Sequence, residues 1–160
     1  MAITYLTGDA TSPKGDGPHV IIHINNNFGA WGAGFVMSLS QKWPYPELRY
    51  KDGIADGRLL LGIVQLVQVE ENIYVANMVA QDGFPTEERP VAVDYEALTL
   101  CLRKLGKHLP TSYQIHGPRI GTGIGGGDWD TIAEIIEREL PDHDVKIYTL
   151  PGSRFLEEIE

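Results

Sequence analysis

Strand patterns and helix patterns alternate along nearly the whole of the 160-residue chain. The densest strand pattern is HVIIHINN at 19–26, a β-branched run typical of a strand buried on both faces. Three segments carry apolar residues at helical spacing, at 33–43, 94–109 and 129–140. Further strands are predicted at 2–7, 61–69, 73–81, 112–121 and 145–150. This order predicts an α/β fold with a mixed central sheet sandwiched between helices.

The connections between these elements also carry information. Residues 61–69 and 73–81 flank a short polar turn and predict an antiparallel hairpin. Residues 44–60 are turn-rich and polar, and 82–93 contain a glycine and two prolines, so we expect loops in both places. Because no repeat, low-complexity tract or linker interrupts the pattern, a single domain over residues 1–160 is predicted.

Composition excludes several classes of protein. The net charge of −9 argues against a partner such as duplex nucleic acid or an anionic membrane, since both require a basic field. The single cysteine, Cys101, excludes an internal disulfide, and the five scattered histidines have no metal-ligand spacing. The N-terminal residues do not read as a signal peptide, and no segment reads as a membrane span. We therefore expect a cytoplasmic protein without a metal or cofactor.

Five of the seven residues from Gly121 to Gly127 are glycine, directly ahead of a helix pattern. Each glycine costs about 0.5–1 kcal/mol relative to alanine in regular structure, so the loop needs positive φ angles or a close approach to its backbone. The sequence of this loop contains the pattern G-x-G-x-x-G, the fingerprint of dinucleotide-binding oxidoreductases. That fingerprint expects an acidic residue at the end of the next strand, and VKIYTLPG at 145–152 has none, which argues against it.

A second glycine-bearing loop, NNFGAWGAG at 26–34, follows the strand at 19–26. Ligands of open α/β sheets bind beyond the carboxyl ends of the strands, and bare N–H groups ahead of a helix attract anions. The two loops are therefore predicted to clamp a diphosphate at one edge of the sheet. Two ordinary tight turns are the alternative interpretation.

Three motifs in order resemble the macro domain family: TGDAT after the first strand, HINNNFGAWGAGF after the second, and PRIGTGI after the penultimate strand. The resemblance covers nearly the whole chain. The residues of the last two motifs most resemble those of the branch that contains the terminal ADP-ribose protein glycohydrolase. The resemblance implies binding of ADP-ribose and, in many members, hydrolysis of ADP-ribose esters on proteins.

Carried over by position, the resemblance implies a set of ligand-binding residues. Asp9 and the backbone of Ala10 are expected at the adenine, whose pocket Tyr148 and Leu150 line. The N–H groups of one phosphate loop come from Ala33, Gly34 and Phe35. The second phosphate loop comprises Gly121, Thr122, Gly123, Ile124 and Gly125, with Thr122 and Ile124 beside the terminal ribose. Asn25 and Asn27 are expected near the same ribose.

The sequence departs from that branch at its catalytic positions. The branch's aspartate corresponds to Gly125, and no lysine stands at 79–81, where its nucleophile would fall. Catalytic candidates in this chain are Asp94, Arg89 and Asp128. Asp94 and Asp128 also precede helix patterns, where carboxylates are good N-caps, so both roles stay open. Arg89 lies in a segment typical of solvated surface.

Two functions remain open from the sequence. The first is hydrolysis of ADP-ribose from modified proteins, at an ester bond to acidic side chains. The second is a non-catalytic module that binds ADP-ribose or ADP-ribosylated protein. His23 falls in the buried strand, where we expect a hydrogen-bonded core histidine rather than a base.

Overall fold

The computed structural model describes residues 3–152, and its centre is one sheet with the strand order β1-β6-β5-β2-β4-β3. Neighbouring strands are parallel except β3, which pairs antiparallel with β4 as the predicted hairpin. The strands span Thr4–Thr7 (β1), His19–Asn26 (β2), Val64–Glu70 (β3), Ile73–Gln81 (β4), Gln114–Gly117 (β5) and Val145–Thr149 (β6).

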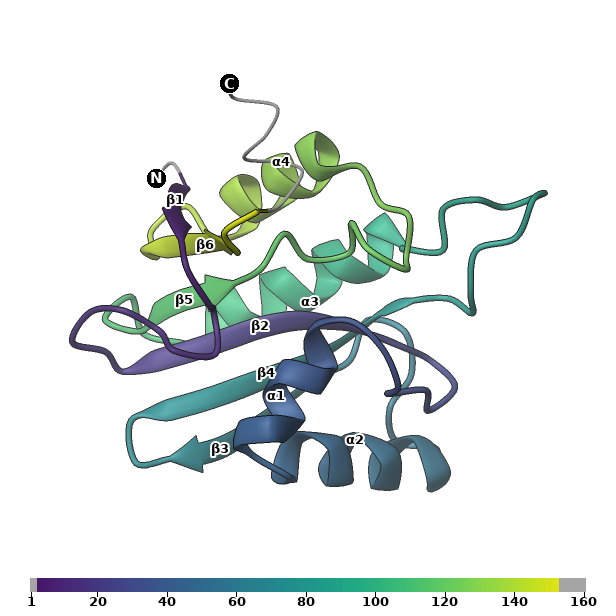
Figure 1. Cartoon of the computed structure of the whole chain (residues 1–160), viewed down its shortest axis with the longest axis horizontal. Coiled ribbons are helices and arrows are strands. Elements are labelled where there is room, and N and C mark those ends of the chain that lie inside the picture. Colours follow the sequence, from purple (N-terminus) through teal and green to yellow (C-terminus); the bar gives the residue numbers. More distant parts are fainter. Residues whose placement is uncertain (1–2, 153–160) are drawn as a thin grey trace.

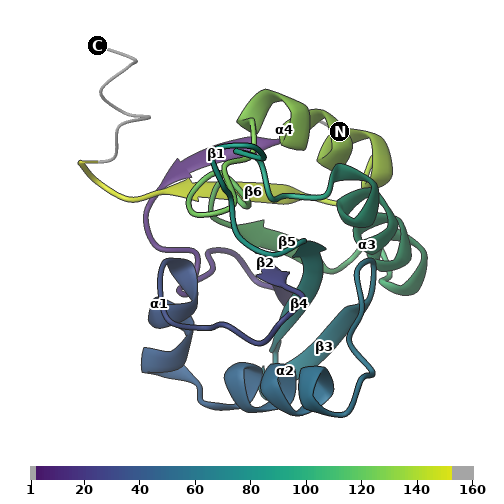
Figure 2. The same cartoon turned by 90° about the vertical axis from the view of Figure 1, so that its right-hand side faces the viewer.

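Helices cover both faces of this sheet. Figure 2 shows α1 and α2 on one face and α3 and α4 on the other. The helices span Phe35–Lys42 (α1), Tyr45–Ala55 (α2), Tyr95–His108 (α3) and Trp129–Glu139 (α4). The predicted α/β fold with a mixed sheet between helices is therefore confirmed. None of the helices within residues 3–152 has the length and hydropathy that crossing a bilayer requires.

Strand β2 holds the two cores apart. Seven of its eight residues are buried, and it pairs in parallel with β4 on one side and β5 on the other. Because successive side chains of a strand point to opposite faces, Val20 and Ile22 join the core under α3 and α4. Ile21 joins the core under α1 and α2. Polar residues at alternate positions of β2 lie on this second face and lead towards the end of the strand.

Helix α2 corrects the sequence interpretation, which expected a loop over 44–60. Pro46 stands in the first turn, where a missing N–H leaves no hydrogen bond unmade. Two prolines and Gly53 made the segment read as turns, although a proline at this position favours a helix start. The helix buries Tyr50 completely against the second core.

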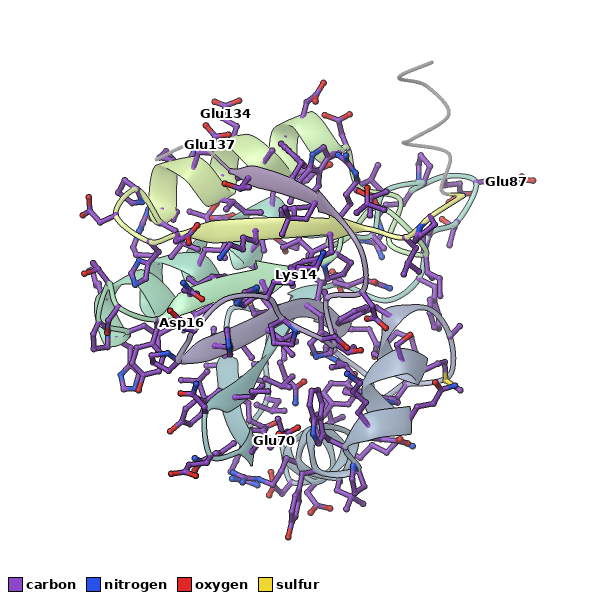
Figure 3. The ribbon with its side chains drawn as sticks, turned by 60° about the vertical axis from the view of Figure 1, so that its left-hand side comes forward. Lys14, Asp16, Glu70, Glu87, Glu134 and Glu137 are labelled. Carbon is purple, nitrogen blue, oxygen red and sulfur yellow. The ribbon has the colours of Figure 1, made fainter. Side chains whose placement is uncertain are left out.

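Parallel pairing places the ends of β2, β4, β5 and β6 at the same edge of the sheet, which faces the viewer in Figure 2. The connections that follow these strands start at this edge: 27–34, 82–94, 118–128 and the residues after Thr149. Segment 82–93 extends away from the body as the teal loop on the right of Figure 1. In Figure 3, Glu87 of this loop points outward into open space.

Tyr50 anchors the first of these connections. Its buried hydroxyl lies 2.7 Å from both the carbonyl and the side-chain oxygen of Asn26, and it accepts a hydrogen bond from the Gly29 N–H at 3.1 Å. The Asn26 side-chain oxygen in turn accepts from the N–H groups of Phe28 and Ala30. One hydroxyl on α2 thus fixes the start of loop 27–34.

We expect Tyr50→Phe to lower the free energy of unfolding by about 1–3 kcal/mol, because the buried Asn26 carbonyl loses its donor and the Gly29 N–H loses its acceptor. Denaturant unfolding monitored by circular dichroism measures this change. Tyr45→Phe on the same helix is the matched control, since Tyr45 is 60% exposed, and it should change stability little. Equal stability of the two variants would contradict the anchoring role of Tyr50.

Candidate functional site

A cavity of about 710 Å³ opens at the carboxyl edge of the parallel strands. Connections after β2, β4, β5 and β6 contribute to its lining, so segments far apart in the sequence meet there. Most of the residues named from the sequence as ligand contacts line this cavity: Asn25, Ala33, Gly34, Phe35, Gly121, Thr122, Gly123, Ile124, Gly125, Tyr148 and Leu150. The structure therefore brings both glycine loops together at one cavity, as expected from their places after two parallel strands.

The N-terminus of α1 forms one wall of the cavity. Gly34 is the N-cap residue, with φ +83° and no side chain to cap the helix. Within residues 3–152, no acceptor is seen for the N–H groups of Phe35 and Val36. These bare donors and the positive end of the helix dipole make this wall attractive to an anion.

The loop 118–127 forms the opposite wall. Its backbone closes on itself through the Gly127 N–H, which donates to the Gly121 carbonyl at 2.8 Å. The Gly123, Ile124 and Gly125 N–H groups have no acceptor within the described part of the chain. The cavity thus has free backbone donors on two sides, with no lysine needed to supply positive potential.

Gly125 shows why the loop is rich in glycine. It is buried, and a Cβ there would stand 2.8 Å from Val93 Cγ2 and 3.1 Å from Gln81 Oε1. Its carbonyl accepts hydrogen bonds from the N–H groups of Ala92, at 2.8 Å, and Val93, at 3.3 Å. The close approach expected from the glycine content is therefore made by segment 82–93 of the chain itself. The aspartate that the resemblance expects at this position would require these neighbouring side chains to shift.

Tyr148 lies at the β6 end of the cavity, beside Leu150, which is 58% exposed. The Tyr148 hydroxyl accepts from the Lys14 N–H at 2.9 Å and lies 2.8 Å from His116 Nδ1. His116 Nε2 lies 2.9 Å from His19 Nδ1, and burial lowers the pKa of His116 to about 3, so this chain of side chains is uncharged at neutral pH. In Figure 3, Lys14 lies over the sheet in this region. Tyr148 is itself 3% exposed, so Leu150 supplies the exposed apolar surface at this end of the cavity.

The predicted adenine partners Asp9 and Ala10 do not line the cavity. Asp9 is exposed, and its Oδ1 accepts from both the N–H and the hydroxyl of Thr11 at 2.8 Å. Ala10 is buried. The turn that the sequence suggested as the alternative for Asp9 is therefore present.

The β2 end of the cavity holds polar groups without partners. Asn25 is buried, and neither its amide nitrogen nor its oxygen has a hydrogen-bond partner within residues 3–152. His23, two residues earlier on the same face, also lines the cavity, and its Nδ1 is buried without a partner. Buried polar atoms of a folded protein are nearly always hydrogen-bonded, so these atoms indicate a place for a polar ligand.

Asn27 has a different position from Asn25. Its amide nitrogen donates to Asp82 at 2.9 Å, and its oxygen accepts from the Gly83 N–H at 3.1 Å. It lies outside the lining and joins the connection after β2 to the one after β4. Phe28 and Phe84 meet in an edge-to-face contact beside this link, with ring centroids 4.8 Å apart.

The three catalytic candidates lie outside the lining as well. Asp94 accepts from the Ala97 N–H at 3.0 Å and Asp128 from the Thr131 N–H at 3.0 Å, so both cap helices. The Thr131 hydrogen bonds lower the pKa of Asp128. The Arg89 guanidinium donates to the Asp82 carbonyl and holds the extended loop.

No Asp, Glu or Lys is found among the described residues that line the cavity. Within 3–152, no group of three or more His, Cys, Asp and Glu is arranged to hold a metal ion.

Gln81, Phe84 and Arg119 are among the lining residues that were not predicted from the sequence. Gln81 ends β4, so its place at the carboxyl edge could have been inferred from the predicted hairpin. Arg119 lies within the quoted PRIG motif, and its guanidinium stacks over Tyr5 and Trp129 at 5.0 and 5.4 Å from the ring centroids. Phe84 lies in a loop whose path the sequence does not specify.

Comparison with known proteins gives close structural relatives, although no family model matches the chain. A macrodomain protein from Streptomyces coelicolor is 36% identical, with a TM-score of 0.80, over 92% of this chain and 98% of that one. A Bacteroides thetaiotaomicron protein of unknown function is 39% identical, with a TM-score of 0.88, over 92% and 98% of the two chains.

More distant relatives carry names that mention ADP-ribose. An ADP-ribose 1''-phosphate phosphatase from Saccharomyces cerevisiae strain YJM789 is 25% identical, and the match spans 92% of this chain and 98% of that protein. A structure of Thermosipho africanus DarTG in complex with ADP-ribose has the same fold, with 18% identity and a TM-score of 0.67. That match covers 83% of this chain and 38% of the other.

The capping role of Asp94 leads to a test of stability. We expect Asp94→Ala to lower the free energy of unfolding by about 1 kcal/mol, because the Ala97 N–H loses its acceptor. Asp94→Asn is the matched control, since asparagine caps as well as aspartate does. Thermal unfolding of the three proteins measures the difference, and unchanged stability of Asp94→Ala would rule out a capping contribution.

Proposed function

Because the chain belongs to the macrodomain family, we propose that its cavity binds ADP-ribose, either free or attached to a protein. One observation carries the proposal: backbone N–H groups without an acceptor in residues 3–152 stand on two walls of a single cavity, at the start of α1 and in loop 118–127. A diphosphate between these walls would receive hydrogen bonds from both sides. Arg119 is the one lysine or arginine in the described lining, so the backbone supplies most of the attraction.

The two ends of the cavity suit the two ends of that ligand. At the β6 end, the side chain of Leu150, beside the buried Tyr148, offers apolar surface to adenine. At the β2 end, the unpartnered amide of Asn25 offers both a donor and an acceptor to ribose hydroxyls. A volume of about 710 Å³ lies within the usual range for small-molecule sites. The names of the yeast and Thermosipho relatives support the same ligand.

Hydrolysis of ADP-ribose from modified proteins, at an ester to an acidic side chain, is the second candidate. The yeast relative, named as a phosphatase, favours an activity of this class. Hydrolysis needs an activated water and stabilisation of developing charge. Because no Asp, Glu or Lys is found in the described lining, we propose that the bound diphosphate itself orients the water. Binding without turnover is the alternative.

The proposed contact between loop 118–127 and the diphosphate can be tested by substituting a single residue. A Cβ at Gly123 meets nothing within 4 Å, so Gly123→Glu should fold normally. It should abolish measurable ADP-ribose binding in calorimetry, because a carboxylate would lie beside the diphosphate. Gly123→Gln is the matched control of equal size without the charge, and it should bind more tightly than the glutamate variant. Wild-type affinity in Gly123→Glu would place the anion elsewhere.

Turnover can be tested on protein that carries glutamate-linked ADP-ribose. If the chain is a hydrolase without its own base, wild type and Asp94→Asn should release free ADP-ribose at similar rates, measured by chromatography. A loss of release in Asp94→Asn with unchanged stability would instead identify Asp94 as a catalytic base. No release by wild type that binds ADP-ribose would assign the chain to the binding module.

A further inference from the structure

We propose that His23 selects the terminal sugar of the ligand, its Nδ1 accepting a hydrogen bond from a hydroxyl of the terminal ribose. This inference rests on the proposed binding of ADP-ribose and assigns a specificity-determining residue within that site. His23 lies on β2, two residues before Asn25 and on the same face, and it lines the cavity.

The hydrogen-bond network under β2 decides which nitrogen of His23 carries the proton. Asn77 Nδ2 donates to the Pro46 carbonyl at 3.1 Å and to Gln65 Oε1 at 3.0 Å, so the amide orientation of Asn77 is fixed. Its Oδ1 lies 2.6 Å from His23 Nε2 and can only accept. His23 Nε2 must therefore be the N–H donor, and Nδ1 of the neutral ring keeps a lone pair.

His23 remains neutral at physiological pH. Complete burial lowers the pKa of His23 to about 4, although the hydrogen bond to Asn77 opposes the shift. A base this weak has little tendency to remove a proton from a sugar or a water at neutral pH. Its role is to accept a hydrogen bond and so to position the ligand.

The contacts that the structure gives for His23 supply no donor to its Nδ1. Within the described chain, Nδ1 has no hydrogen-bond partner. Two of its neighbours are the rings of Trp31 and Phe35, with centroids 5.4 and 6.0 Å away. The Trp31 N–H already donates to Ser40 at 2.7 Å, and Phe35 has no polar side-chain atom.

The lone pair on His23 Nδ1 can bond only to a part of the ligand that donates a hydrogen bond. A diphosphate carries only acceptors at neutral pH and is repelled by a lone pair, whereas ribose hydroxyls donate. The neighbouring Asn25 amide also lacks a partner among the described residues, so two residues on one face of β2 have side-chain atoms free to bond a ligand. A hydroxyl-bearing group at this end satisfies both.

The variant His23→Gln tests the assignment. The side-chain amide of glutamine can still donate to Asn77, but it places no acceptor where Nδ1 of the histidine stands. Affinities for ADP-ribose and for ADP, which lacks the terminal ribose, are measured by calorimetry. We expect ADP-ribose to bind about tenfold more weakly to the variant, the loss of one buried hydrogen bond, with ADP unchanged. Ile21→Val, two residues before His23 on the same face and outside the lining, is the matched control for altered packing.

A second measurement does not depend on the variant folding. The ¹⁵N resonance of His23 Nδ1 in wild type should shift upfield when ADP-ribose is added and stay unchanged with ADP. Equal loss of both affinities in His23→Gln, or an unshifted Nδ1 resonance, would overturn the assignment. So would a wild type that binds ADP as tightly as ADP-ribose. A wild type that binds neither ligand would instead overturn the proposed function.

Discussion

The parallel pairing of β2 with both of its neighbours is the constraint on which the rest of the structure depends. It fixes β2 in the middle of the sheet, with β4 and β5 alongside and helices over both faces. Parallel strands must end at the same edge, so the connections that follow β2, β4, β5 and β6 start at one side of the molecule. The cavity exists because these connections share that edge.

The strands and the amphipathic helices could be predicted because their periodicity is a property of the sequence itself. The strand at 19–26 has the bounds expected for it, and the apolar spacing of Leu98, Leu102 and Leu105 gives α3. Helix α2 could not be predicted in the same way, because its apolar face is short and prolines stand at its start. What stabilises it is a tertiary contact, the Tyr50 hydroxyl on loop 27–34, and sequence spacing does not reveal such a contact.

The candidate site was predictable where backbone chemistry alone decides it. Glycines before helix patterns at the ends of parallel strands predicted both walls, and the structure brings Gly34 and Gly123 to one cavity. The roles of side chains were harder to predict from the sequence, because they depend on neighbours from other helices and strands. The lone pair on His23 Nδ1 follows from the orientation of the Asn77 amide. That orientation depends on hydrogen bonds to Gln65 and to a carbonyl at the start of α2.

Gly125 connects the packing of the loops to the absence of a carboxylate in the described lining. Its carbonyl receives the N–H groups of Ala92 and Val93, and its missing side chain gives Val93 the space to pack. That contact sets the position of Asp94, whose own N–H donates to the Ala80 carbonyl at 2.8 Å while its carboxylate caps α3. A Cβ at 125 would stand 2.8 Å from Val93 Cγ2, so the contact between the two loops would have to shift. The residue that the resemblance expects for catalysis therefore conflicts with the packing that closes this wall of the cavity.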